Sequence, residues 1–364
     1  MLAYQFLAAL AMAAVVSSLV SGWIVRFGNR LKILDDPVTH KHPKVVHKET
    51  VPRGGGIPIF AAVATGVLIF LPWSMKIYGI IGGMLILAIT GFADDRYTEK
   101  VSPYFRLVLN GMAAIAVIGT GVGIAFVNSP LGGLVRLDWP QWCFSLWGSE
   151  HCIWVLADLF ALLWLVWMQN IVGWSSGVDG QMPGFVIIAA LAMAALGLRF
   201  SDDPNQTMVV VLGAIVAGAY LGFLPWNWYP QKMMPGYGGK ALAGFLLGVL
   251  AILSQAKVGA MIMVLTIPMM DAMLVMVKRI AEGRSPVWGG YDHLHHYLLD
   301  RGWSKRGIAG FYWGVSALMA VMAIRLQATS KYFTIAATGL ILGGIILWLH
   351  YFSTFSKQPG RDSG

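Results

Sequence analysis

Three histidines, His293, His295 and His296, lie within four positions of a hydrophilic segment in a strongly apolar chain. Imidazoles can bind metals, grip anions or carry protons near neutral pH, so a run this dense is rarely needed for packing. The three could bind a metal together with Asp292. With Arg284, Arg301 and Arg306 nearby, we favour the gripping of a diphosphate over a metal site or a merely solvated loop.

A second reactive pattern is the adjacent pair Asp94 and Asp95 at the end of an apolar segment. Neighbouring carboxylates repel each other unless a cation or a proton intervenes. Successive helix positions point about 100° apart, so one carboxylate could face a metal ion and the other a nucleophile. The alternative is a solvated helix end with Arg96 as counter-ion.

Three further clusters contain groups suited to phosphate or nucleotide binding. Asn170 and Asp179 flank a glycine-containing loop, and Lys240 follows the glycines of 236–239 at a predicted helix start, where backbone N–H groups attract phosphate. The third cluster combines cations with a glycine run and contains His47, Lys48 and Arg53. Each could instead be an ordinary loop, a turn with a snorkelling lysine, or cytoplasmic positive charge.

The elements that must position these residues are membrane helices. The chain is 57% hydrophobic and 12% charged, with a mean hydropathy of +0.67, whereas soluble domains carry roughly 25% charged residues. We expect an all-α polytopic membrane protein with about 11 transmembrane helices, and we expect the 240–277 stretch to be two helices split at 254–257. The predicted spans are 4–27, 56–73, 77–93, 105–127, 152–172, 184–199, 207–225, 240–256, 258–277, 307–325 and 332–352.

The basic residues predict the orientation of these helices. With the N-terminus outside and the C-terminus inside, 20 of the 26 Lys and Arg residues are cytoplasmic and 6 are outside, as the positive-inside rule requires. The net charge of +9 then reflects loops that face anionic lipid, so we expect no nucleic-acid partner. We expect one integral-membrane domain over 1–355 and a short cytoplasmic tail over 356–364.

All five polar clusters fall on the cytoplasmic face in this topology. A transporter would distribute polar groups near the membrane midplane and on both sides. Convergence on one face is instead expected of an enzyme that joins a soluble substrate to a lipid. On the outer side, the 128–151 loop has the composition of a hairpin, and Cys143 and Cys152 there are either disulfide-bonded or two free thiols. No cysteine shares the face of the histidines, which excludes a Cys/His metal centre.

In their order along the chain, these clusters resemble the polyprenyl-phosphate N-acetylhexosamine-1-phosphate transferases, also called glycosyltransferase family 4. The resemblance extends from Asp36 to Gly302. It rests on His47 with Pro52-Arg53 and Gly55-Gly56, on Asp94-Asp95, on Asn170 through Asp179-Gly180, on the glycine segment to Leu242, and on His293-x-His295-His296. The histidine pattern is similar to that of the N-acetylglucosamine branch rather than the muramoyl-pentapeptide branch.

The resemblance implies an enzyme of the cell (inner) membrane that transfers sugar-1-phosphate, with N-acetylglucosamine-1-phosphate the first expectation, from a UDP-N-acetylhexosamine to polyprenyl (undecaprenyl) phosphate. UMP is released and a cell-envelope glycan is initiated. The implied cofactor is Mg²⁺, or Mn²⁺ in its place, and homodimers are common in the family. A catalytically impaired relative and a transporter or flippase are the alternatives.

Residue roles follow from the same resemblance. The implied catalytic residues are Asp94 and Asp95, and with Asp179 they are the implied metal ligands. The implied substrate-binding residues are His47, Lys48, Arg53, Asn170, Asp179, Lys240, His293, His295 and His296. Several family positions differ here.

The departures from the family pattern concern the metal ligands most. A metal-binding aspartate of the family aligns with Gly236, and an aspartate three positions before the first histidine aligns with Gly290. Gly173 and Ser176 replace a family Asn and Asp, and Tyr297 replaces an Arg. Asp292 is an additional carboxylate and a candidate substitute ligand.

Overall fold

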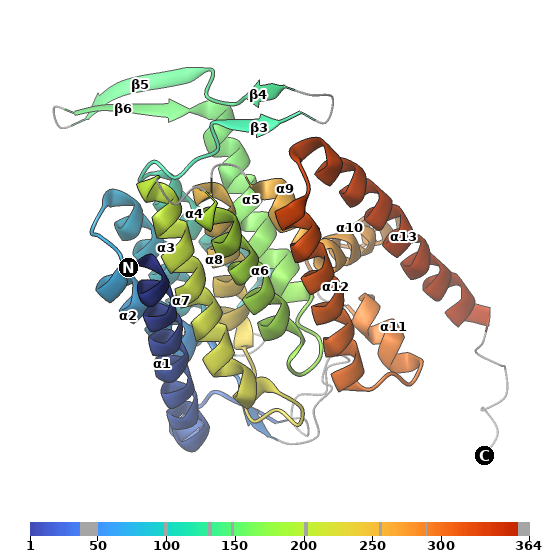
Figure 1. The fold of residues 1–364 in the computed structure, drawn as a ribbon. Helices are drawn as coiled ribbons and strands as arrows, with labels where there is room; N and C mark the ends of the chain where they lie inside the picture. The colour runs from blue at the N-terminus through green and yellow to red at the C-terminus, as the bar shows by residue number, and fades with distance from the viewer. Residues whose placement is uncertain are drawn as a thin grey trace, which may run out of the picture.

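The computed structural model describes residues 1–36, 50–97, 101–129, 133–146, 149–199, 203–254, 257–288 and 290–355. These residues form a bundle of helices with three short two-stranded sheets (Figure 1). The helices are α1 (Leu2–Leu31), α2 (Gly56–Phe70), α3 (Met75–Arg96), α4 (Pro103–Ile118), α5 (Val155–Trp174), α6 (Gln181–Leu198), α7 (Pro204–Asn227), α8 (Gly236–Leu253), α9 (Val258–Val264), α10 (Thr266–Ala281), α11 (Leu294–Asp300), α12 (Lys305–Arg325) and α13 (Ala328–Phe355).

The described helices make the chain a multi-pass membrane protein. Eight of them are long and apolar enough to cross a bilayer, and α9 with α10 forms a ninth candidate that is bent by 85°. Helices α2 and α4 are apolar but have only 15 and 16 residues. Each of the eleven predicted segments therefore contains a helix, whereas eleven full spans are not confirmed.

Two predicted spans need correction. The 105–127 segment leaves the helix at Ile118, because Gly119, Gly121 with φ +82° and Gly123 interrupt it before a strand begins at Phe126. The 258–277 segment is not one straight helix, since it breaks at Leu265. The predicted division of 240–277 near 254–257 is confirmed by the end of α8 and the start of α9.

Helices α7 and α8 are the centre of the bundle. Of their apolar windows 83% and 89% are buried, against 28% for α1 and 17% for α13, which lie on the outside of the bundle (Figure 1). Because lipid is as apolar as the protein interior, an evenly apolar helix can occupy either environment. Burial, rather than composition, therefore distinguishes the central helices from those that face lipid.

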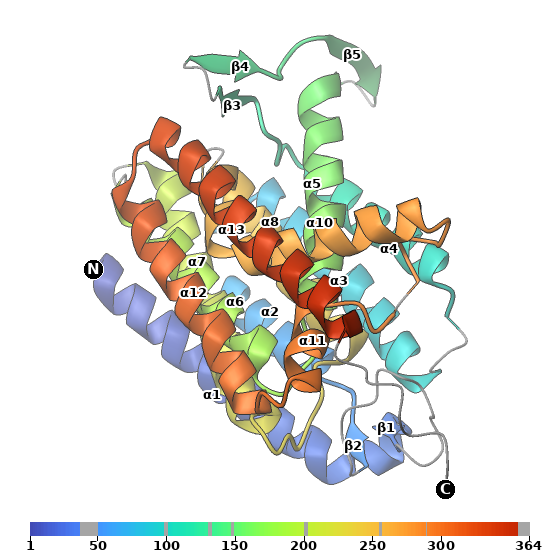
Figure 2. The same cartoon turned by 90° about the vertical axis from the view of Figure 1, so that its right-hand side faces the viewer.

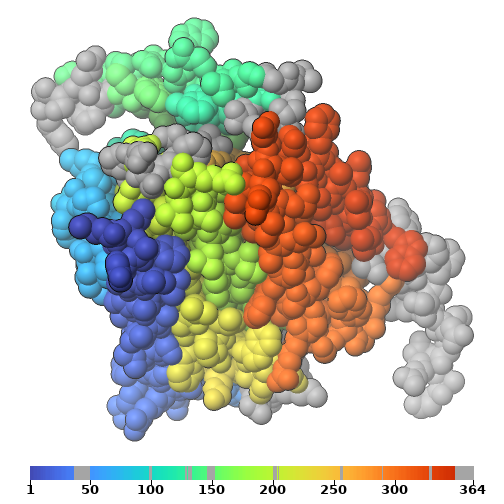
Figure 3. Space-filling model, in the orientation of Figure 1, coloured from blue at the N-terminus to red at the C-terminus, as the bar shows by residue number. Residues whose placement is uncertain are grey.

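The strands form antiparallel pairs. β1 (Leu34–Asp35) pairs with β2 (Val51–Pro52), β3 (Phe126–Asn128) with β4 (Leu134–Arg136), and β5 (Gln141–Leu146) with β6 (Ser149–Trp154). The last four strands make a layer across one end of the bundle (Figure 3). The predicted hairpin is confirmed, and Cys143 and Cys152 form a disulfide across it.

At the opposite end of the bundle, glycines allow three helices to meet backbone to backbone. A Cβ on Gly91 of α3 would lie 2.2 Å from Cα of Gly238 in α8, and one on Gly56 of α2 would lie 2.9 Å from the same Cα atom. No larger residue fits without moving a helix. This contact fixes the end of α3, and therefore Asp94 and Asp95, against the start of α8.

Candidate active site

The two adjacent aspartates at the end of α3 are buried and surrounded by basic groups. Asp94 and Asp95 are 5% and 3% exposed. Arg106 Nε lies 3.3 Å from Asp94 Oδ1, and Arg53 Nε lies 3.9 Å from Asp95 Oδ1. Burial without a counter-charge would be costly, so these guanidinium groups and the neighbouring Lys240 offset the two negative charges. Arg53 and Lys240, both predicted to bind substrate, thus lie close to the aspartates.

Asp95 also caps the first turn of α8. The backbone N–H of Tyr237 donates to Asp95 Oδ1 at 2.9 Å, where a carboxylate complements the positive end of the helix dipole. The Tyr237 hydroxyl in turn donates to Asn110 Oδ1 at 2.8 Å, and the guanidinium of Arg106 lies 5.2 Å from the Tyr237 ring centre. Helices α3, α4 and α8 thus hold the carboxylate pair in one arrangement.

Asp179 lies in the loop between α5 and α6 and has its own partners. Lys305 Nζ donates to Asp179 Oδ1 at 3.3 Å, and the Gln231 backbone N–H donates to Oδ2 at 3.4 Å. The loop turns at Gly180 with φ +77°, a conformation that suits glycine. Asp179 therefore joins this loop to the start of α12.

The histidine run begins the short helix α11 and is oriented from α10. Asp271 is fully buried, and it accepts from His293 Nδ1 at 2.9 Å and from the Leu294 backbone N–H at 2.7 Å. The ring of His293 is nearly parallel to that of His295, at 5.6 Å between centres. The carboxylate of Asp271 in α10 thus sets the ring orientation of His293.

His295 connects the histidine helix to the other clusters. A Cβ on Gly177 would lie 1.8 Å from His295 Nε2, so the imidazole occupies the space that this glycine leaves open. Among the residues that the structure describes, His295 Nδ1 is buried without a hydrogen-bond partner, as is Ser175 Oγ in the loop that contains Gly177. Lys240 is close enough to act electrostatically on His295 as well as on both aspartates. Buried polar atoms without partners are expected where a polar ligand binds.

Sequence comparisons place this arrangement among known proteins. Residues 77–255 match the family model described as glycosyl transferase family 4. The chain belongs to glycosyl transferase family 4. It is 27% identical to a decaprenyl-phosphate N-acetylglucosaminephosphotransferase of Mycolicibacterium smegmatis, covering 92% of this chain and 84% of that protein. It is 28% identical to a phospho-N-acetylmuramoyl-pentapeptide-transferase of Desulforudis audaxviator, covering 88% and 95%.

Three further residues were predicted to bind substrate in this family 4 chain. The structure gives a contact for one of them and does not describe the other two. Asn170 Nδ2 donates to the carbonyl of Val166 in its own helix at 2.7 Å. His47 and Lys48 lie outside the described residues. Sequence reasoning assigned no site role to Arg106 or Lys305, whose only signal was a basic residue at the edge of an apolar segment.

The additional carboxylate, Asp292, is held by three cations. Its oxygens lie 3.7 Å from Lys278 Nζ, 3.2 Å from Arg279 Nη2 and 3.7 Å from Arg284 Nη1. Burial raises the pKa of Asp292, but the three positive charges outweigh it and the pKa lies below its ordinary value. Asp292 thus serves as an anchor for the segment that precedes His293.

The donor chemistry of the aspartate pair fits Mg²⁺. This ion is usually held by one or two carboxylates together with substrate phosphates, and Asp94 and Asp95 supply two buried carboxylates side by side. Over the described ranges, no three His, Cys, Asp or Glu side chains group as in an all-protein metal centre. Joint ligation by Asp94, Asp95 and Asp179 stays a prediction.

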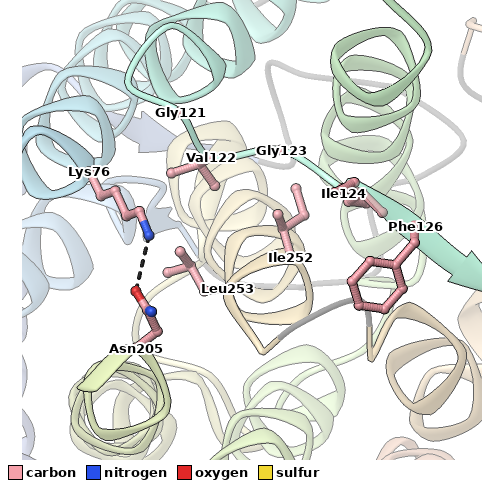
Figure 4. A pocket seen from close by; sticks show the side chains of 10 residues that line it. Lys76, Gly121, Val122, Gly123, Ile124, Phe126, Asn205, Ile252 and Leu253 are labelled. Carbon is pink, nitrogen blue, oxygen red and sulfur yellow. Dashed lines mark hydrogen bonds between the residues drawn. The ribbon is translucent and has the colours of Figure 1, made fainter. Parts of the chain in front are cut away.

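A small cavity lies at the other end of α3, far from the aspartates. It is lined by the loop 121–126, by Ile252 and Leu253, and by Lys76, which donates to Asn205 Oδ1 at 3.0 Å (Figure 4). Lys76 is in the first turn of α3 and Asp95 in its last. This cavity therefore has no part in the aspartate and histidine site.

We expect Asp271→Ala to lower both stability and activity. The substitution removes the acceptor of two buried hydrogen bonds, and a bond to a charged group is worth about 1.5–3 kcal/mol. The thermal midpoint in detergent should fall, and release of UMP should fall with it because His293 loses its orientation. The matched control is Asp300→Ala, which removes an exposed acceptor of the Tyr291 hydroxyl. Equal effects of the two substitutions would contradict the role given to Asp271.

A second expectation concerns pH. Burial, with His296 and His293 nearby, lowers the pKa of His295 well below its ordinary value of 6.5. The unfolded chain then binds a proton more readily than the folded one, so the stability that neutral His295 contributes is present above about pH 6.5 and lost as pH falls below it. Thermal midpoints measured at about pH 7.5 and 5.5 should differ less in His295→Gln than in the wild type. An unchanged difference would show that His295 does not cause the loss.

Proposed function

We propose that the protein transfers a sugar-1-phosphate, with N-acetylglucosamine-1-phosphate as the first candidate, from a UDP-sugar to a polyprenyl phosphate. The observation that supports this most strongly is the buried Asp94–Asp95 pair among Arg53, Arg106 and Lys240, with His295 within electrostatic reach of Lys240. Relatives named as decaprenyl-phosphate N-acetylglucosaminephosphotransferases support the choice of lipid and sugar.

The reaction joins two anions. An oxygen of the lipid phosphate attacks the β-phosphorus of the UDP-sugar, the bond from that phosphorus to the bridging oxygen breaks, and UMP leaves with the oxygen. The nucleophile is already charged, so the main requirement is electrostatic stabilisation of phosphate oxygens. Arg53, Arg106 and Lys240 can supply positive charge on the aspartate side, and the histidines and Lys305 can do so on the nucleotide side.

Magnesium is part of the proposal. Asp94 and Asp95 would hold Mg²⁺ together with substrate phosphate oxygens, and the ion would neutralise charge on the transferred phosphate. Asp95 also has a structural role. It accepts a hydrogen bond from the Tyr237 N–H, which keeps the start of α8, and with it Lys240, in place. Asp179 and Lys305 would contact the nucleotide.

We further propose that the protein lies in the inner membrane and that its site faces the cytoplasm. The disulfide-bonded hairpin and the aspartates lie at opposite ends of the bundle, and disulfides persist on the outer, oxidising side of a membrane. The excess of basic residues at the aspartate end supports the same orientation. UDP-sugars would then reach the site from the cytoplasm.

The test is an assay with purified protein, undecaprenyl phosphate, Mg²⁺ and a panel of radiolabelled UDP-sugars. Formation of a lipid-linked sugar diphosphate with equimolar UMP is the expected result. Binding of a UDP-sugar without turnover under all conditions would favour an impaired relative. Movement of a sugar lipid across vesicles without synthesis would favour a flippase. Either of these outcomes overturns the proposal.

A further inference from the structure

Three large apolar side chains lie on one face of the disulfide-bonded hairpin β5–β6. Trp142 pairs with Ile153 across the strands, and Phe144 lies two residues along from Trp142, so their side chains share a face. These three side chains are 68%, 38% and 39% exposed, and the rings of Trp142 and Phe144 lie 6.3 Å apart. Gln141 and Ser145 are on the opposite face with the disulfide. Three large apolar groups are thus presented together, and each has more than a third of its surface exposed.

The hairpin is joined directly to α5, which has an exposed apolar side. β6 ends at Trp154 and α5 begins at the next residue, so no linker separates the hairpin from the helix. Leu156, Leu159 and Leu163 lie on one side of α5 and are 43%, 49% and 61% exposed. Figure 2 shows the first turns of α5 projecting beyond the neighbouring helices. The apolar surface of α5 is exposed as far as its first turn. Such a surface is stable when lipid, rather than water, surrounds it.

The length of α5 places the membrane boundary at the hairpin. Twenty residues at 1.5 Å each span about 30 Å, the thickness of a hydrocarbon core, so α5 crosses the core only if its first turns lie inside it. The single carboxylate of the helix, Asp158, is in that first turn and accepts from the Trp154 N–H at 3.1 Å. A charged cap of this kind is tolerated at the interface and costly deeper in the membrane.

We propose that the β5–β6 hairpin is an interfacial membrane anchor, with Trp142, Phe144 and Ile153 in the lipid headgroup region at this end of the bundle. Tryptophan favours this region because its ring is apolar and its N–H is polar. The strands extend sideways from the top of α5, roughly across the helix axes, as a hairpin on a membrane surface must (Figure 1). The disulfide keeps the paired strands in register, so that the apolar side chains enter the interface together.

The test measures the depth of single nitroxide labels in nanodiscs of phosphatidylethanolamine and phosphatidylglycerol. Trp142→Cys and Phe144→Cys report on the apolar face, and Ser145→Cys on the opposite face of the same strand. The native cysteines are disulfide-bonded and do not react with the label. We expect labels at 142 and 144 to be several-fold more accessible to oxygen, relative to a water-soluble nickel chelate, than the label at 145.

Two outcomes would overturn the anchor. Equal access of the nickel chelate at all three positions would mean that the hairpin stands in water. Shielding at 142 together with spin–spin broadening would mean that a second copy, rather than lipid, covers the face. Each variant is first checked for one free thiol and a thermal midpoint near that of the wild type. A variant that fails this check is replaced by Ile153→Cys, which reports on the same face from β6.

Discussion

Asp95→Asn is expected to lower the rate of sugar-phosphate transfer by about 100-fold or more, the scale on which removal of one electrostatic catalytic group acts. Asparagine has nearly the same shape, and its carbonyl can still accept the hydrogen bond from the Tyr237 N–H. What is lost is the negative charge beside Arg53. We would measure UMP release at saturating substrates alongside the thermal midpoint, and we expect the rate to fall while the midpoint changes little.

Asp138→Asn is the matched control for this substitution. It removes the same charge from an aspartate that is bonded to Arg136 near the hairpin, at the far end of the molecule. Transfer should be unaffected there. Full activity of Asp95→Asn, or an equal loss in the two variants, would end the assignment of Asp95 to the reaction.

Gly236→Asp is expected to reduce transfer by at least about tenfold, although it introduces the residue that the family pattern has at this position. A Cβ on Gly236 would lie 2.0 Å from the Arg53 carbonyl oxygen and 2.2 Å from Asp95 Oδ2, and the backbone has φ +61°. A side chain at such a φ costs on the order of 1–3 kcal/mol even without a clash. The thermal midpoint and UMP release should fall together.

Gly302→Ala is the control that tests backbone strain alone, without the steric clash expected at Gly236. Gly302 has φ +83° but no atom of the described residues lies within 4 Å of its Cβ position, so only the backbone cost applies. Its loss of stability should be smaller than that of Gly236→Asp, with transfer nearly unchanged. If Gly236→Asp were more active than the wild type, the arrangement of Arg53, Asp95 and Gly236 described above would be wrong.

Sequence periodicity was sufficient to locate the helices but not to decide which of them cross the membrane. Apolar composition alone cannot distinguish the 16-residue α4 from a full span, because the end of this helix depends on the turn at Gly121. The 258–277 segment was expected to be a single helix, yet the chain breaks at Leu265 between α9 and α10. Local residue preferences do not determine where this break falls, because its position depends on the packing of the helices.

The candidate site was predictable where polar residues are rare and therefore conspicuous. Asp94, Asp95 and the histidines stand out in an apolar chain, and family resemblance gives them roles. Their partners were not predictable, because Arg106 and Asp271 approach them from other helices through tertiary contacts. Charge alone also failed to show that Asp292 is neutralised by three cations rather than directed at a ligand.

The contact between Gly91 and Gly238 has an evolutionary consequence. Where two backbones touch, no side chain can be exchanged to enlarge or reshape the space beside the carboxylates. Variation in substrate choice must then arise elsewhere, among the side chains around α11 and the loop that holds Asp179. Selection could therefore alter which sugar is accepted while the half of the site that handles phosphate stays the same, and the two halves can diverge at different rates.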